Sequence, residues 1–219
     1  MNRPMTASED TPTCWDVPRW HVTSVNVPQI LRSLGLMNQA DWAAELARKL
    51  LEVPRPRRWA HVQGVAAQAR TLATILGNDA DLLESAAWLH DIGYSPELTD
   101  TGFHPLDGAR YLRDVDHADP MLCSLVANHS CAILEAEERR LADALSSEFP
   151  APPPVLNDAL AYCDMTTTPT GGMVSVHDRL TEIVERYGPY DVVTRFVHRA
   201  EPELVSSVVR TDQRLALAR

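Results

Sequence analysis

Histidines and aspartates suited to binding metal ions recur along this chain. His90 and Asp91 stand side by side after the segment 82–89, whose apolar residues recur at helical spacing, and Gly93 follows where a helix would stop. Four more residues of the same two types lie within or at the ends of other apolar, helix-like segments: His61, His104, His129 and Asp164. Imidazole and carboxylate ligands together suit Fe, Mn, Co, Ni or Zn better than Mg or Ca alone. The set indicates a metal site.

Each of these residues also has an ordinary interpretation when it is taken alone. A second His-Asp pair, His177 and Asp178, shows how little the dipeptide means by itself, because Ser175 there predicts a helix N-cap with an acid in the first turn. His90 could likewise be a hydrogen-bonded core histidine. His104 and His129 could be capping or surface residues. What distinguishes His90 and Asp91 from the second pair is the presence of the other four candidate ligands in the neighbouring predicted helices.

Helices are expected to position these side chains. No alternating strand pattern rises above noise, so the predicted fold class is all-α. Each candidate residue is assigned to one predicted helix. The first expected helix follows Asn38 and ends before Pro54, the second, at 57–76, carries His61 and is capped by Gly77, and the third starts at Asp79 or Asp81 and ends at His90 and Asp91. The next opens at His104 with Pro105 in its first turn, and another, at 120–128, precedes His129. The remaining helices are expected at 135–149 (exposed and charged), at 155–163 before Asp164, and, as two or three helices with a turn at Gly188, between 177 and 219.

The domain organisation predicted from composition is simple. Residues 1–27 are rich in Pro, Thr, Asp and Glu without a sustained period, which predicts an irregular N-terminal arm. Residues 28–219 are expected to form a single helical domain with extra C-terminal helices and a metal-binding core at about 57–168.

Charge and hydropathy exclude several classes of partner. The chain has 219 residues, with 20 Lys and Arg against 30 Asp and Glu, and its net charge of -10 argues against a nucleic-acid polymer as partner. No apolar run is long enough to span a membrane, and the N-terminus lacks the apolar region of a signal peptide. We therefore expect a cytoplasmic protein without a membrane partner. The sequence does not set its oligomeric state.

The order of these residues resembles the HD-domain superfamily of metal-dependent phosphohydrolases. Its core motif is a histidine, a His-Asp pair and a distant aspartate, which correspond here to His61, His90, Asp91 and Asp164. Two further histidines, His104 and His129, are similar to those of a two-metal subgroup. The runs RWAHVQGVA at 58–66 and HPLDGA at 104–109 resemble those of bacterial HD proteins that hydrolyse dinucleoside tetraphosphates. The run after His129 differs from that group, which has two threonines and a glycine there.

The resemblance implies an HD-like helical bundle and a site with two divalent transition metal ions. Asp91 would bridge the ions, His61, His90 and Asp164 would complete the shell of one, and His104 and His129 that of the other. His90 and Asp91 would be the catalytic pair. Two ions can activate a water and clamp phosphoryl oxygens, so the implied activity is hydrolysis of a small phosphoester or nucleotide without a protein nucleophile.

An anionic substrate needs neutralising groups as well. Arg58 stands three residues before His61 on nearly the same helical face, so we expect it to contact phosphate, with a surface ion pair as the alternative. Arg110, after His104, is a further candidate substrate-binding residue.

Two other functions remain open at this point. A minority of HD-fold proteins with the same four histidines and two aspartates are di-iron oxygenases that use O2 on a small organic or phosphonate substrate. A non-catalytic signalling module with the HD fold is the second alternative, although the intact ligand set argues against it.

Overall fold

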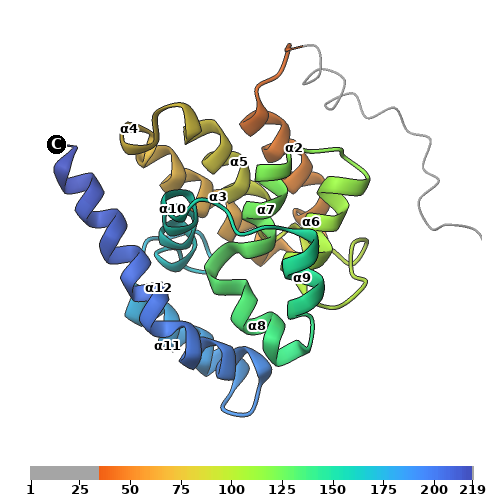
Figure 1. Ribbon diagram of the computed structural model, residues 1–219, viewed down its shortest axis with the longest axis vertical. Helices are drawn as coiled ribbons and strands as arrows, with labels where there is room; N and C mark the ends of the chain where they lie inside the picture. The colour runs from red at the N-terminus through yellow and green to blue at the C-terminus, as the bar shows by residue number, and fades with distance from the viewer. Residues whose placement is uncertain (1–34, 219) are drawn as a thin grey trace, which may run out of the picture.

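Helices form almost all of the regular structure in this computed structural model, which describes residues 35–218 (Figure 1). Within that range the sole β feature is an isolated antiparallel bridge between Thr167 and Met173. The all-α prediction is therefore confirmed. The predicted arm at 1–27 lies outside the described residues. None of the described helices is both long and apolar enough to cross a membrane.

The first helices surround α5 (Ala80–Leu89). It packs against α2 (Gln39–Leu51) on one side and α3 (Pro56–Thr71) on the other. Asn38 caps α2 by accepting a hydrogen bond from the backbone N–H of Asp41 at 2.7 Å. Apolar residues spaced along α2, among them Trp42, face α5 and are buried because their spacing matches the helical repeat.

The long helix predicted at 57–76 is wrong, because the chain turns at Leu72. After α3 comes the short α4 (Ala73–Leu76) and then the 3-10 turn η1 (Gly77–Asp79). The N–H of Leu72 donates to the carbonyl of Ala69, three residues back, and the Thr71 hydroxyl donates to the carbonyl of Gln68. These bonds tighten the last turn of α3 and end it. Gly77 ends α4 with a positive φ, as predicted.

The helix α5 starts after Asp79, as predicted, although no aspartate side chain caps it. Asp79 occupies the N-cap position without a side-chain hydrogen bond to the helix, and the Asp81 carboxylate instead accepts the N–H of Ala40 at 3.3 Å. Asp81 therefore ties α5 to α2. Both His90 and Asp91 are predicted to lie in the last turn of this helix. The helix instead stops at Leu89, so His90 is its C-cap and Asp91 follows the cap.

Glycines let the segment after Asp91 approach the next helix closely. The 3-10 turn η2 (Ile92–Tyr94) packs on α6 (His104–Asp114). A Cβ on Gly93 would lie 2.0 Å from the carbonyl oxygen of His104, and a Cβ on Gly108 would lie 3.1 Å from the Gly93 nitrogen. Only glycine at position 93 fits this contact, which brings the start of α6 next to Asp91.

The chain then forms α7 (Pro120–Asn128) and the turn η3 (His129–Cys131), as predicted for 120–128. The single exposed helix predicted at 135–149 is wrong. It is two helices, α8 (Ala132–Arg139) and α9 (Ala142–Glu148), separated at Arg140 by a left-handed backbone with φ 62°. Their inner faces are buried at Glu135, Ala136 and Leu145.

The C-terminal part consists of α10 (Pro154–Met165), α11 (Val176–Tyr187) and α12 (Val192–Leu217). Figure 1 shows α11 and α12 running along one side of the molecule. The turn at Gly188, with φ 81°, is as predicted. The predicted N-cap at the second His-Asp pair is also confirmed, because the Ser175 hydroxyl accepts a hydrogen bond from the N–H of Asp178 at 3.1 Å.

Candidate metal centre

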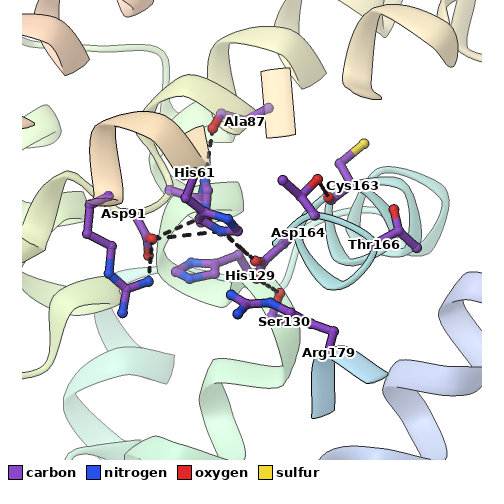
Figure 2. Close-up of polar contacts among 12 residues, drawn as sticks. His61, Ala87, Asp91, His129, Ser130, Cys163, Asp164, Thr166 and Arg179 are labelled. Atoms are coloured by element: carbon purple, nitrogen blue, oxygen red, sulfur yellow. Dashed lines mark hydrogen bonds and ion pairs between the residues drawn. The ribbon is translucent and has the colours of Figure 1, made fainter. Parts of the chain in front are cut away.

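Six side chains from five parts of the chain meet at one buried place. His61 comes from the middle of α3, Asp164 from the end of α10, and the other four from helix ends or turns: His90, Asp91, His104 and His129. His90 is fully buried, and the most exposed of the six, His104, has 12% of its side chain exposed. Figure 2 shows His61, Asp91, His129 and Asp164 directed toward one another. The structure thus brings together all six predicted ligands.

Their ligand atoms form two groups that share Asp91. His61, His90 and Asp91 are one group, and Asp91, His104 and His129 are the other, with the atoms of each within 4.8 Å of one another. The Oδ2 atom of Asp91 lies 3.6 Å from His90 Nε2 and 4.0 Å from His61 Nε2. Its other oxygen, Oδ1, lies 3.4 Å from His104 Nε2. The two oxygens of one carboxylate therefore face different histidines.

Asp164 joins the first of these groups. Its Oδ1 atom lies 3.0 Å from His61 Nε2 and 3.9 Å from His90 Nε2. The helix α10 contacts both α3 and α5, so Asp164, near its C-terminal end, reaches the histidines of both.

Backbone carbonyls fix the tautomer of three histidines. His61 Nδ1 lies 3.0 Å from the carbonyl of Thr168, His90 Nδ1 2.9 Å from that of Ala87, and His129 Nδ1 2.7 Å from that of Val126. A carbonyl oxygen only accepts hydrogen bonds, so each Nδ1 carries the hydrogen. In a neutral ring Nε2 then presents a lone pair. All three lone pairs face the centre of the cluster.

Each of two close contacts in the cluster needs a proton or a metal ion between its two atoms. His61 Nε2 faces Asp164 Oδ1 at 3.0 Å, and His104 Nε2 faces His129 Nε2 at 3.2 Å. His90 Nε2 is buried and has no hydrogen-bond partner among the described residues. A buried acceptor left in this state is costly, and metal-binding histidines commonly hold their other nitrogen on a carbonyl. The donor set therefore fits divalent transition metal ions.

The electrostatics favour the protonation states that metal binding requires. Burial opposes ionisation of both aspartates, yet the Arg58 guanidinium beside Asp91 holds the pKa of that carboxyl well below its ordinary value. The contact with His61 and the charges of His90 and Arg179 likewise lower the pKa of Asp164. Burial also lowers the pKa of His104 and of His129. At neutral pH the carboxylates are thus charged and these two imidazoles neutral.

Comparison with protein families identifies this arrangement. The family model named HD domain matches residues 58–164, a segment that begins at Arg58 and ends at Asp164. The chain contains an HD domain. It is a member of the HD superfamily of metal-dependent phosphohydrolases, and the buried histidines and aspartates fit the metal site of that superfamily. No curated protein and no solved structure matches the chain significantly.

Arg58 of the HD domain does not lie free at the surface. Its Nη1 donates to Asp91 Oδ2 at 2.7 Å, and its guanidinium lies 3.8 Å from the centre of the Tyr94 ring. Tyr94 in turn stacks on His104 with ring centres 4.0 Å apart. Arg58 also lines the cavity beside the cluster. It therefore supports Asp91 directly, and its predicted contact with substrate stays a prediction.

Arg110 lies elsewhere in the HD domain. Its guanidinium donates to both oxygens of Glu148 on α9, at 2.5 and 3.1 Å, and it lines a separate pocket with Asp100 and Asp107. The six-residue spacing from His104 places its side chain away from His104 on α6, because about 1.7 helical turns separate the two positions. This geometry gives no support to the predicted role of Arg110 in binding substrate at the cluster.

Ser130 is a site residue that the sequence did not reveal. Its hydroxyl donates to Asp164 Oδ2 at 2.5 Å, which leaves Oδ1 to face His61 and His90. Ser130 and Cys131 both have positive φ, 48° and 61°. No glycine or asparagine occupies either position, so the sequence carries no signal for this turn.

Proposed function

We propose that this protein is a metal-dependent phosphohydrolase that cleaves a small phosphoester with the help of two metal ions. The observation that carries the proposal is the position of Asp91, whose two oxygens face two separate histidine groups. A carboxylate in that position suits a bridge between two ions. Asp91 with His61, His90 and Asp164 would hold one ion, and Asp91 with His104 and His129 the other.

The ions, when bound, would polarise a phosphoryl oxygen and lower the pKa of the attacking water. The reaction then needs no other reactant: the water oxygen bonds to phosphorus, the ester P–O bond breaks, and the organic group leaves as an alcohol. The protein's own residues hold the centre in shape. Arg58 keeps Asp91 ionised, and Ser130 fixes one oxygen of Asp164.

The test uses the purified full-length chain loaded in turn with Mn, Fe and Co. We expect metal-dependent release of phosphate from a panel of phosphoesters, and loss of that release in the variant Asp164→Asn. His177→Ala is the matched control, because His177 belongs to the exposed His-Asp pair on α11 and should leave activity unchanged.

Two other results would overturn the proposal. Consumption of O2 with an organophosphonate or polyol, without release of phosphate from any ester, would mean that the chain is an oxygenase. A chain that binds less than one ion and has no activity would be a non-catalytic module.

A further inference from the structure

The cavity beside the metal centre is lined in large part by helices outside the HD domain. Its floor includes Asp91, His104, His129 and Asp164. Its other walls come largely from α11 and α12, which follow the matched segment 58–164. These two helices therefore determine much of what a molecule at the metal centre would contact.

Arg179 of α11 reaches into this cavity from a buried position. The residue is 3% exposed, and in Figure 2 its side chain extends toward Ser130 and His129, which line the same cavity. Its Nη1 donates to Glu182 at 2.6 Å, but its Nε has no hydrogen-bond partner among the described residues. A buried donor is costly when unsatisfied, so this N–H calls for an acceptor that the described chain does not supply.

Arg186, two turns further along α11, lines the same cavity together with Arg58. Glu182 is shared by the two arginines of α11, since Arg186 Nε lies 3.6 Å from its Oε1. The carboxylate of Glu135, which also lines the cavity, is paired with Arg139 at 2.7 Å. Burial lowers the pKa of Arg186, and repulsion from Arg58 and Arg179 adds to it although Glu182 opposes it. Three arginines, Arg58, Arg179 and Arg186, thus line a cavity that also contains the carboxylates of Asp91, Glu135 and Asp164.

The rest of the wall is apolar and the space is small. The apolar side chains come from α11 and α12: Ile183, Val193, Phe196, Val197 and Leu204. The cavity volume is about 70 Å³, which is room for about five waters. Pockets for larger ligands have about 300–1,000 Å³. A phosphoryl group fills such a space, and an organic group bonded to it would lie against the apolar side chains of α11 and α12.

We propose that Arg179 and Arg186 bind the phosphoryl group of the substrate, and that the apolar wall selects phosphomonoesters with a compact apolar organic group. This inference rests on the proposed function. It assigns substrate-binding side chains to α11 and α12, which follow the HD domain in the chain.

Binding of inorganic phosphate to the metal-loaded full-length protein tests the role of the arginines. We expect Arg179→Gln and Arg186→Gln each to weaken phosphate binding about tenfold or more by calorimetry, with unchanged metal content, because each removes a charged hydrogen bond. Arg195→Gln is the matched control, since that arginine is exposed on α12 and pairs with Glu138. If Arg179→Gln does not fold, Arg186→Gln carries the test, because 26% of that side chain is exposed.

Hydrolysis by the wild-type protein tests the substrate class. We expect kcat/KM for phenyl phosphate to exceed that for AMP and for diadenosine tetraphosphate. A preference for either nucleotide would overturn the apolar selection. Unchanged phosphate affinity in both arginine variants, with hydrolysis intact in the wild type, would overturn the anion site alone. Arginine-dependent phosphate binding without hydrolysis of any ester would overturn the proposed function instead.

Discussion

At the scale of single residues, the chemistry of the centre depends on which histidine nitrogen faces inward. Three backbone carbonyls, from Thr168, Ala87 and Val126, hold the Nδ1 hydrogens and so leave Nε2 free to bind metal. Substitution of a side chain does not remove a backbone carbonyl, so these three hydrogen bonds cannot be deleted by a point mutation. Ser130 is the side-chain counterpart on Asp164, and it can be tested.

Ser130→Ala should weaken metal binding. Without the hydroxyl, Asp164 Oδ2 loses its 2.5 Å hydrogen bond and the carboxylate is free to rotate away from His61. Removing a residue that hydrogen-bonds to a metal ligand lowers metal affinity about 10- to 100-fold. We therefore expect metal affinity to fall about tenfold, measured by competition with a metal chelator. Ser147→Ala, at an exposed serine of α9, should change nothing. Equal affinity in both variants would show that Ser130 does not orient Asp164.

The buried histidines predict how stability depends on pH in the metal-free protein. Because the pKa values of His104 and His129 are lowered in the folded state, the unfolded chain binds more protons below about pH 6.5. The contribution of these two histidines to folding stability is complete above that pH, and it is lost as the pH falls toward their lower pKa values in the folded state. We expect the free energy of unfolding in EDTA to fall between pH 7 and 5.5, by up to about 1.4 kcal/mol per pH unit for each histidine. Denaturant unfolding that shows constant or rising stability over this range would contradict it.

At the scale of elements, close backbone contacts at glycine bring the ligands together. The loop after α10 lies against α3 so closely that a Cβ on Gly64 would be 2.5 Å from the carbonyl oxygen of Gly171. The same loop supplies the Thr168 carbonyl that holds His61. The orientation of His61 therefore depends on a glycine one turn away.

Gly64→Ala should destabilise the protein although alanine favours helices. Overpacking costs about 1–3 kcal/mol, which exceeds the gain in helix propensity of about 1 kcal/mol. We expect a lower melting temperature together with weaker metal binding, because Thr168 must move from His61. Gly172→Ala is the control in the same loop, since its Cβ would meet only Thr168 Oγ1, at 3.4 Å. A stabilised Gly64→Ala variant would mean that the loop moves without cost.

Helix caps and apolar spacing predicted most of the elements, and they failed where the chain gave no signal. α6 and α7 begin where Pro105 and Pro120 predict them. The breaks at Leu72 and Arg140 were missed because neither residue is a glycine or proline. Hydrogen bonds and packing in the folded chain set these breaks, and they cannot be read from local propensity.

At the scale of the whole molecule, the metal centre joins helices that are far apart in the sequence. The six predicted ligands meet because α10 contacts α3, α5 and α12 and so lies between the two hydrophobic clusters. The sequence predicted the ligands by type and order. It did not predict Arg179 and Arg186, because nothing in their spacing relates α11 to α3.

The number of metal ions per chain tests the central claim most directly. Elemental analysis of the full-length protein, purified without chelator, should give about two ions per chain for the wild type and for the control His177→Gln. Asp91→Asn should lose both ions, because Asp91 faces both histidine groups, and His104→Gln should lose mainly one. A wild-type chain with a single ion, or Asp91→Asn with two, would contradict a centre bridged by Asp91.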